Sequence, residues 1–141
     1  MKKLIVSVFV SLIAVSASAT DWLYIDTDKL GVDNYIDAHS VRVVDQNAQI
    51  VTAFIKMRGI EKSKLKIENK TIDSSSIKFS YDCRNENSKS LSSIFYDANG
   101  AVIHSDNNAG QFNSIHPGTS HYLNMYSACA IAGFKDISNL L

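Results

Sequence analysis

Several features are scarce or missing in the sequence, and each shortage excludes a class of protein. The 141 residues hold 14 Lys and Arg against 14 Asp and Glu, so no basic excess favours nucleic acid or an anionic membrane surface. After the first 15 residues, no apolar run is long enough to span a membrane. No Gly-x-Ser-x-Gly turn, glycine-rich phosphate loop or internal repeat occurs. We therefore expect no nucleic-acid partner, no transmembrane segment in the mature chain, no cofactor and no enzyme activity.

The N-terminus has the pattern of a secretory signal peptide. Met1-Lys2-Lys3 is basic, residues 4–15 are almost wholly apolar, and Ala17-Ser18-Ala19 supplies the small residues that a signal peptidase reads. We expect cleavage after Ala19, which leaves residues 20–141 as one exported domain. An uncleaved anchor helix is the alternative, but the apolar run is shorter than the ~20 residues that span a bilayer. No cysteine lies near the cleavage position to carry a lipid, so we expect a periplasmic, surface-located or secreted protein.

Only two cysteines occur, Cys83 and Cys129, and both belong to the mature chain. An even number of cysteines in an exported protein favours a disulfide, and two cysteines allow one intramolecular pairing. Two free buried thiols and an intermolecular bridge are the alternatives. A bridge between these cysteines stabilises the fold by closing a long loop in the unfolded chain.

The two cysteines lie in segments of different period. Residues 77–83 alternate apolar and polar side chains, which predicts a strand with one face on a core. The apolar face of this strand holds Ile77, Phe79, Tyr81 and Cys83. Residues 121–132 instead repeat every three or four positions, as one face of a helix does. The residues of that helix face are Tyr122, Met125, Tyr126 and Cys129.

The ends of this helix also have recognisable signals. Thr119 or Ser120 is expected to cap its first turn, and Gly133 to end it. Earlier segments alternate as strands between turn residues, at 21–26, 35–37, 41–44, 49–58, 71–83, 90–96 and 101–105. Strands followed by a single helix predict an α+β fold. We expect an antiparallel sheet of five or six strands, with one C-terminal helix packed on one face and joined to the sheet by the disulfide.

Two groups of residues resemble metal sites but have a simpler interpretation. The four histidines have no i, i+4 or His-x-His spacing, so we expect exposed loop and cap histidines instead of zinc ligands. They are His39, His104, His116 and His121. An acidic segment partly matches a calcium loop at Asp26, Asp28, Gly31, Asn34 and Asp37. Leu30 stands where that loop needs an oxygen ligand, so we expect an acidic turn and no metal.

The sequence between the fourth and fifth predicted strands is rich in lysine. It holds Lys62, Lys64, Lys66 and Lys70. Such a cluster can attract an acidic partner such as a sulfated glycan, but lysines also protect a sheet edge from aggregation, and we expect the second role. Residues 59–69 have little pattern and predict a loop or a long hairpin end.

Taken in order, these features resemble the surface-adhesin protein E family of small exported bacterial proteins. The matching positions are Tyr35-Ile36-Asp37 with Ser40, Cys83, Pro117 with Thr119 and Ser120, and Cys129. The resemblance implies an antiparallel sheet closed by a C-terminal helix and a disulfide. It also implies a surface protein that binds host extracellular-matrix or plasma proteins. The resemblance further implies that the protein forms a homodimer.

One departure from this family concerns the anchor. The namesake adhesins carry a lipid-anchored N-terminus, whereas this sequence has no anchoring cysteine, so a periplasmic or released protein fits equally well. The alternative function is therefore an envelope structural or interaction module that binds a partner from the same cell. In either case we expect a protein partner, bound through the open face of the sheet or through residues 59–69. No host-binding residue of the family can be matched to a position here, and none is assigned.

Overall fold

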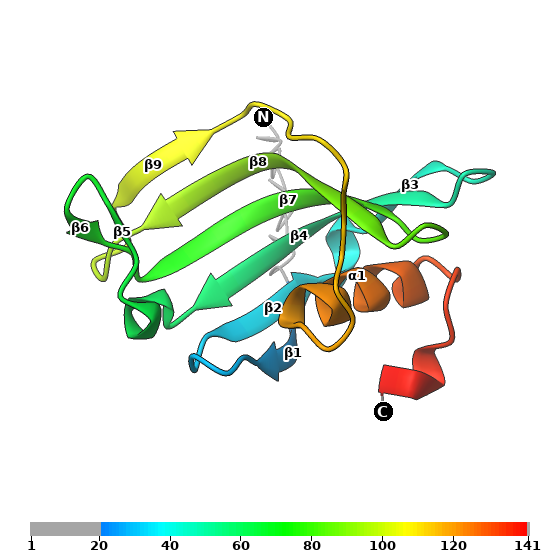
Figure 1. Cartoon of the computed structure of the whole chain (residues 1–141), viewed down its shortest axis with the longest axis horizontal. Helices are drawn as coiled ribbons and strands as arrows, with labels where there is room; N and C mark the ends of the chain where they lie inside the picture. Colours follow the sequence, from blue (N-terminus) through cyan, green and yellow to red (C-terminus); the bar gives the residue numbers. More distant parts are fainter. Residues whose placement is uncertain (1–20, 141) are drawn as a thin grey trace, which may run out of the picture.

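The computed structural model describes residues 21–140 as an antiparallel sheet with one α-helix across one of its faces (Figure 1). The predicted signal peptide, with its cleavage position after Ala19, lies outside the described residues. Within the described residues, none of the helices has both the length and the apolar character that a membrane span requires.

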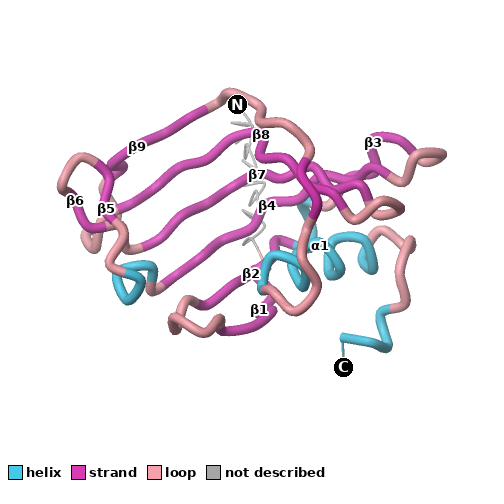
Figure 2. Tube along the Cα trace, in the orientation of Figure 1, coloured by secondary structure: helices cyan, strands magenta, loops and turns pink. Residues whose placement is uncertain are grey.

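The main sheet has eight strands in the order β1-β2-β4-β7-β8-β10, with β3 paired to β4 and β9 paired to β8 (Figure 2). All of these pairings are antiparallel. The strands are β1 (Trp22–Thr27), β2 (Asp33–Asp37), β3 (Arg42–Asp45), β4 (Ile50–Arg58), β7 (Ser74–Asp82), β8 (Asn87–Tyr96), β9 (Val102–Asp106) and β10 (Asn113–Ser114). A separate two-stranded hairpin consists of β5 (Lys66–Ile67) and β6 (Lys70–Thr71).

The helix α1 (Ser120–Ile131) has the ends that its sequence predicts. The Oγ1 atom of Thr119 accepts a hydrogen bond of 3.2 Å from the backbone N–H of Tyr122, which satisfies one of the unpaired donors of the first turn. Gly133 follows the helix with a φ of 85°, a conformation that glycine adopts without steric cost. Three short 3₁₀ helices complete the fold, η1 (Ala38–Ser40), η2 (Ile60–Ser63) and η3 (Ile137–Leu140).

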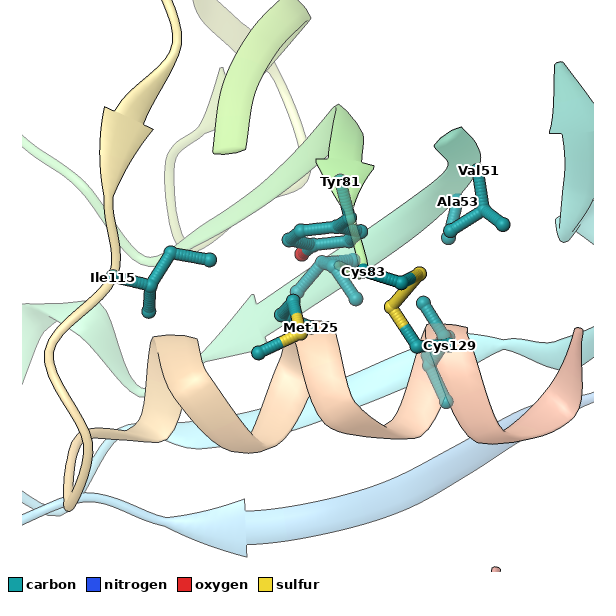
Figure 3. Close-up of a cluster of buried hydrophobic side chains, with 10 residues drawn as sticks. Val51, Ala53, Tyr81, Cys83, Ile115, Met125 and Cys129 are labelled. Carbon is teal, nitrogen blue, oxygen red and sulfur yellow. A yellow bond between two sulfur atoms is a disulfide. The ribbon is translucent and has the colours of Figure 1, made fainter. Parts of the chain in front are cut away.

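The main core lies between α1 and the sheet. The close-up in Figure 3 shows Tyr81 and Met125 facing each other, with the disulfide beside them. Both cysteines are paired, and their Cα atoms are 5.8 Å apart, so the predicted Cys83–Cys129 bridge is confirmed. The fully buried side chains of this core include Ile36, Val51, Ala53, Ile55, Tyr81, Met125, Ala128 and Cys129. The bridge therefore joins the sheet to the helix inside the core.

Some local predictions were wrong. The main sheet has eight strands instead of five or six, because the four-residue β3 and the two-residue β10 are strands of their own, and segments this short leave little periodic signal. Of the two alternatives for residues 59–69, the long hairpin end is the correct one, because they lie in the connection between the antiparallel strands β4 and β7 and contain η2 and β5. Tyr126 does not join the main core; its hydroxyl donates to the backbone oxygen of Asp136 at 3.1 Å, and Asn139 donates to that hydroxyl at 2.8 Å. Its ring therefore packs toward the C-terminal tail, at the flank of the helix face.

Candidate functional site

The two faces of the sheet have different surroundings. Along β4, Val51, Ala53 and Ile55 point toward α1 and are fully buried. Side chains alternate faces along a strand, so the even-numbered residues of β4 point the other way. We call this second side, formed by the even-numbered residues of β4 and β7 and their cross-strand neighbours, the open face. The α-helix lies on the opposite side of the sheet (Figure 1).

Four cationic side chains of the open face each lie over an aromatic ring, whereas a fifth, Arg42 of β3, pairs with Thr52 and donates to the backbone oxygens of His39 and Val41. The distances from the cationic group to the ring centroid range from 4.7 to 5.6 Å. These contacts are the attraction between a positive charge and the negative face of a π-system. The four pairs are Lys56 over Trp22, Arg58 over Tyr35, Lys78 over Phe54, and Lys89 over Phe112.

The sheet register brings these residues together. Lys78 of β7 pairs directly with Phe54 of β4, and Lys56 of β4 pairs directly with Tyr35 of β2. Residues that pair across antiparallel strands lie on the same face, so long side chains reach the neighbouring rings. Tyr35 also contacts Tyr24 of β1, with the ring centroids 5.7 Å apart in an edge-to-face arrangement. The open face is therefore a band of rings and cations across several strands.

The charges of these four cations are not neutralised by ion pairs. Within residues 21–140, the ion pairs join His39 to Asp21 and Lys135 to Glu86, and neither involves the open-face cations. Burial lowers the pKa of Lys56, and the positive charge of Arg58 lowers this pKa further. Two like charges next to each other make a site that a negative ligand stabilises.

The open face also holds carboxylates, and they have partners of their own. Asp33 accepts a hydrogen bond of 2.6 Å from the hydroxyl of Thr27. Asp37 accepts from the backbone N–H of His39 at 3.0 Å, where it caps η1. Asp82 accepts from three donors, the backbone N–H groups of residues 84 and 85 and the side-chain amide of residue 85. These carboxylates stabilise turns and strand ends and do not form salt bridges with the cations above the rings.

The carboxylates of the acidic segment that partly matched a calcium loop accept hydrogen bonds from different donors. Asp28 caps its own turn by accepting from the backbone N–H groups of Leu30 and Val32. Asp26 accepts a hydrogen bond of 2.7 Å from Ser120 at the start of α1. Within residues 21–140, no cluster of three or more His, Cys, Asp or Glu side chains has the geometry to hold a metal ion. The carboxylates of this segment do not converge on a common point, because each one is turned toward its own donor.

A groove of 760 Å³ lies between the start of α1 and the turn that joins β1 to β2. Asp26 and Asn124 contribute polar atoms to its wall, and Leu30, Met57 and Leu123 contribute apolar ones. Asn124 donates a hydrogen bond of 3.3 Å to Asn34, so the two buried amides satisfy part of each other's polar groups. This groove is on the helix side of the sheet and is separate from the open face.

The four histidines are dispersed, as their spacing predicts, but His121 is not an exposed cap residue. It is half-buried beside Phe79, with the ring centroids 4.9 Å apart, and its Nε2 atom lies 2.6 Å from the hydroxyl of Ser88. Burial lowers the pKa of its imidazole. No local pattern predicts this contact, because it joins residues that are 33 positions apart.

The lysine-rich segment also divides between two roles. The ammonium group of Lys62 donates a hydrogen bond of 3.0 Å to the backbone oxygen of Gly31, which ties η2 to the turn between β1 and β2. Lys64 has a positive φ of 61° and ends η2, whereas Lys66 and Lys70 lie on the small hairpin. At least one lysine of this predicted cluster is therefore structural, and the open-face cations are a different set.

Known proteins share the sequence pattern and the fold of this chain. The family model described as surface-adhesin protein E matches residues 22–130. A structure of Haemophilus influenzae protein E, crystal form II, has a TM-score of 0.57 and 24% sequence identity, covering 83% of this chain and 96% of that chain. A second structure of Haemophilus influenzae protein E has a TM-score of 0.53 and 22% identity, covering 79% of this chain and 89% of that chain. No curated protein matches the sequence.

Proposed function

Because the chain belongs to the surface-adhesin protein E family, we propose that it is a non-enzymatic exported adhesin that binds a host extracellular-matrix or plasma protein. In this proposal, residues 20–141 are the mature domain after cleavage behind Ala19. The protein acts from the cell surface or after release from the cell. The disulfide suits an oxidising compartment outside the cytoplasm.

The observation that carries this proposal is the open face. An adhesin needs a stable surface that presents anchor side chains, and Tyr, Trp and Arg are the residues that most often supply the energy of protein interfaces. The open face presents Trp22, Tyr24, Tyr35 and Arg58 on neighbouring strands. Tyr24 is 59% exposed and is free to contact a partner. The disulfide-linked core packs against the other side of the sheet.

The experiment is a binding assay with the mature domain and immobilised laminin, vitronectin and plasminogen. We expect binding of at least one of them at micromolar protein concentration. The Tyr24→Ala variant should weaken that binding, whereas Leu65→Ala should not, since Leu65 is equally exposed at 58% but lies outside the open face. Failure of all three host proteins, with capture of an envelope protein from the same cell, would favour the envelope module instead.

A homodimer is the second part of the proposal. In Figure 1 the helix crosses only part of its side of the sheet, and β8 and β9 extend beyond it. A small apolar cluster of Val32, Ile60 and Ile72 lies at that end of the sheet, with Phe95 packed against it. That cluster is buried within one chain, whereas Met57, Ile67 and Phe95 around it are only partly buried. A second copy that covers this end would remove the remaining apolar surface of these three side chains from water. Light scattering coupled to size exclusion tests this, and a monomeric mass across the micromolar range would contradict it.

A further inference from the structure

The four cations of the open face that lie over aromatic rings form a row. Arg58 and Lys56 are two residues apart on β4, Lys78 on β7 pairs with the position two residues before Lys56, and Lys89 on β8 pairs with Ser80. Each step from one cation to the next therefore moves two residues along the strands, and the last two steps also move one strand across. With about 3.4 Å per residue and about 4.8 Å between strands, successive Cα atoms are about 7–8 Å apart.

The rings below these cations hold them without removing their charge. A carboxylate in the same position would neutralise the lysine or arginine, whereas an aromatic ring attracts the cation and leaves its net charge intact. The ring also restricts the long side chain, so less conformational entropy is lost when a ligand binds. The row is therefore a set of preorganised positive charges at regular intervals.

A row of separate charges favours a linear anionic chain over a compact anion. A single phosphate or carboxylate contacts one or two of these groups, whereas a chain with anionic groups at intervals contacts all four. Between the cations, the open face presents small hydroxyl side chains. They are the half-buried Ser74, Ser76 and Ser92.

Hydroxyl groups and tyrosine rings distinguish between the linear anions. Serine hydroxyls both donate and accept hydrogen bonds, as the hydroxyls of a sugar do. The exposed ring of Tyr24 offers a flat apolar surface to the C–H groups of a pyranose. A peptide that binds by strand addition would instead need the backbone groups of a sheet edge, which this face does not offer.

We infer that the open face binds an acidic glycan chain, with its sulfate or carboxylate groups on Arg58, Lys56, Lys78 and Lys89. This inference deepens the proposed function and rests on it, because an adhesin can bind a matrix protein through a glycan attached to that protein. It also places acidic-glycan recognition away from the lysine-rich segment in which the sequence suggested it.

The mature domain contains its own reporter for this binding. Trp22 is the single tryptophan of the sequence, and the ammonium group of Lys56 lies 5.3 Å from its ring centroid. The experiment is a titration with a sulfated heparin dodecasaccharide, followed by Trp22 emission and by calorimetry. We expect a saturable change in emission, with an affinity that falls as salt rises. A parallel titration with an oligogalacturonate, which carries carboxylates only, distinguishes the two kinds of anionic group.

Two double variants with the same change in net charge give the decisive comparison. Lys56→Gln/Lys78→Gln removes two cations of the row, and we expect about tenfold weaker binding of the dodecasaccharide. Lys64→Gln/Lys66→Gln removes two exposed lysines outside the open face, and we expect less than a twofold change. Far-UV circular dichroism and a thermal transition establish that both variants are folded.

Several results would overturn the inference. Equal weakening by the two variants would mean diffuse attraction to net positive charge. Equal affinity for polyglutamate or for vesicles of anionic phospholipid would mean that the ligand is not a glycan. Saturable binding without any change in Trp22 emission would place the ligand elsewhere. Glycan binding without binding of laminin, vitronectin or plasminogen would overturn the proposed host-protein function alone. Binding of one of these proteins without glycan binding would overturn the glycan inference alone.

Discussion

Removal of the disulfide is the perturbation with the largest predicted effect on stability. The bridge joins residues separated by 46 positions, so the unfolded chain without it gains the freedom of a large open loop. In the chain-entropy description a loop of this length corresponds to about 4 kcal/mol at 25 °C. A domain of this size has a total stability of roughly 5–15 kcal/mol, so the bridge accounts for a large share of it.

The variant that tests this is Cys83→Ala/Cys129→Ala. Both cysteines are almost completely buried, so alanine avoids an unsatisfied buried hydroxyl but leaves a small void. We expect a loss of about 4–6 kcal/mol in the free energy of unfolding. At about 4 °C per kcal/mol for a domain of this length, the thermal midpoint should fall by roughly 15–25 °C.

The assay is urea denaturation followed by far-UV circular dichroism, with and without a reducing agent. The reducing agent should lower the stability of the wild-type protein toward that of the double-alanine variant and leave the variant unchanged. A loss below about 1 kcal/mol, with an unchanged dependence on urea, would refute the argument from loop closure. It would mean that packing of α1 alone holds the helix to the sheet.

Three further perturbations follow from single contacts. Thr119→Ala removes the helix cap and should cost about 1 kcal/mol in urea denaturation, and Thr119→Ser, which keeps the hydroxyl, should cost much less. Tyr81→Phe should leave stability unchanged or raise it, because the buried Tyr81 hydroxyl has no hydrogen-bond partner; a loss above about 2 kcal/mol would contradict this. Burial lowers the pKa of His121 in the folded state, so the unfolded chain binds the proton more readily and stability should fall as the pH drops below about 7, through the unfolded pKa near 6.5. His121→Gln should flatten that part of the pH profile, and an unchanged slope between pH 7.5 and 5.5 would show that other groups cause it.

The sequence was sufficient for the architecture because the main elements have strong local signals. The alternation that ends at Cys83 and the helical spacing around Met125 and Cys129 each describe one element completely. Once each cysteine had been assigned to the apolar face of its element, the contact between sheet and helix followed. The core in Figure 3 has that arrangement.

The row of cations on the open face could not be predicted from the pattern of each separate strand. Lys56 and Trp22 are distant in the sequence and meet only because β1, β2 and β4 are neighbours in the sheet. Lys89 meets Phe112 because β8 carries the pairing with β10, a strand of two residues that leaves no pattern. A strand shows its own two faces in its sequence, but the register that places one strand beside another depends on the whole fold.

The alternation of β4 and β7 has a consequence for how such proteins diverge. Neighbouring residues of these strands lie in different environments. The odd-numbered positions face the core, whereas the even-numbered positions, apart from the buried Thr52 and Ser80, are at least partly exposed. Substitutions can therefore accumulate at every second position and change what is bound while the fold is kept. A scan of all substitutions along residues 50–58 and 74–82, selected for folding alone, should show tolerance that rises and falls with a period of two. Such a protein can change what it binds without rebuilding its interior.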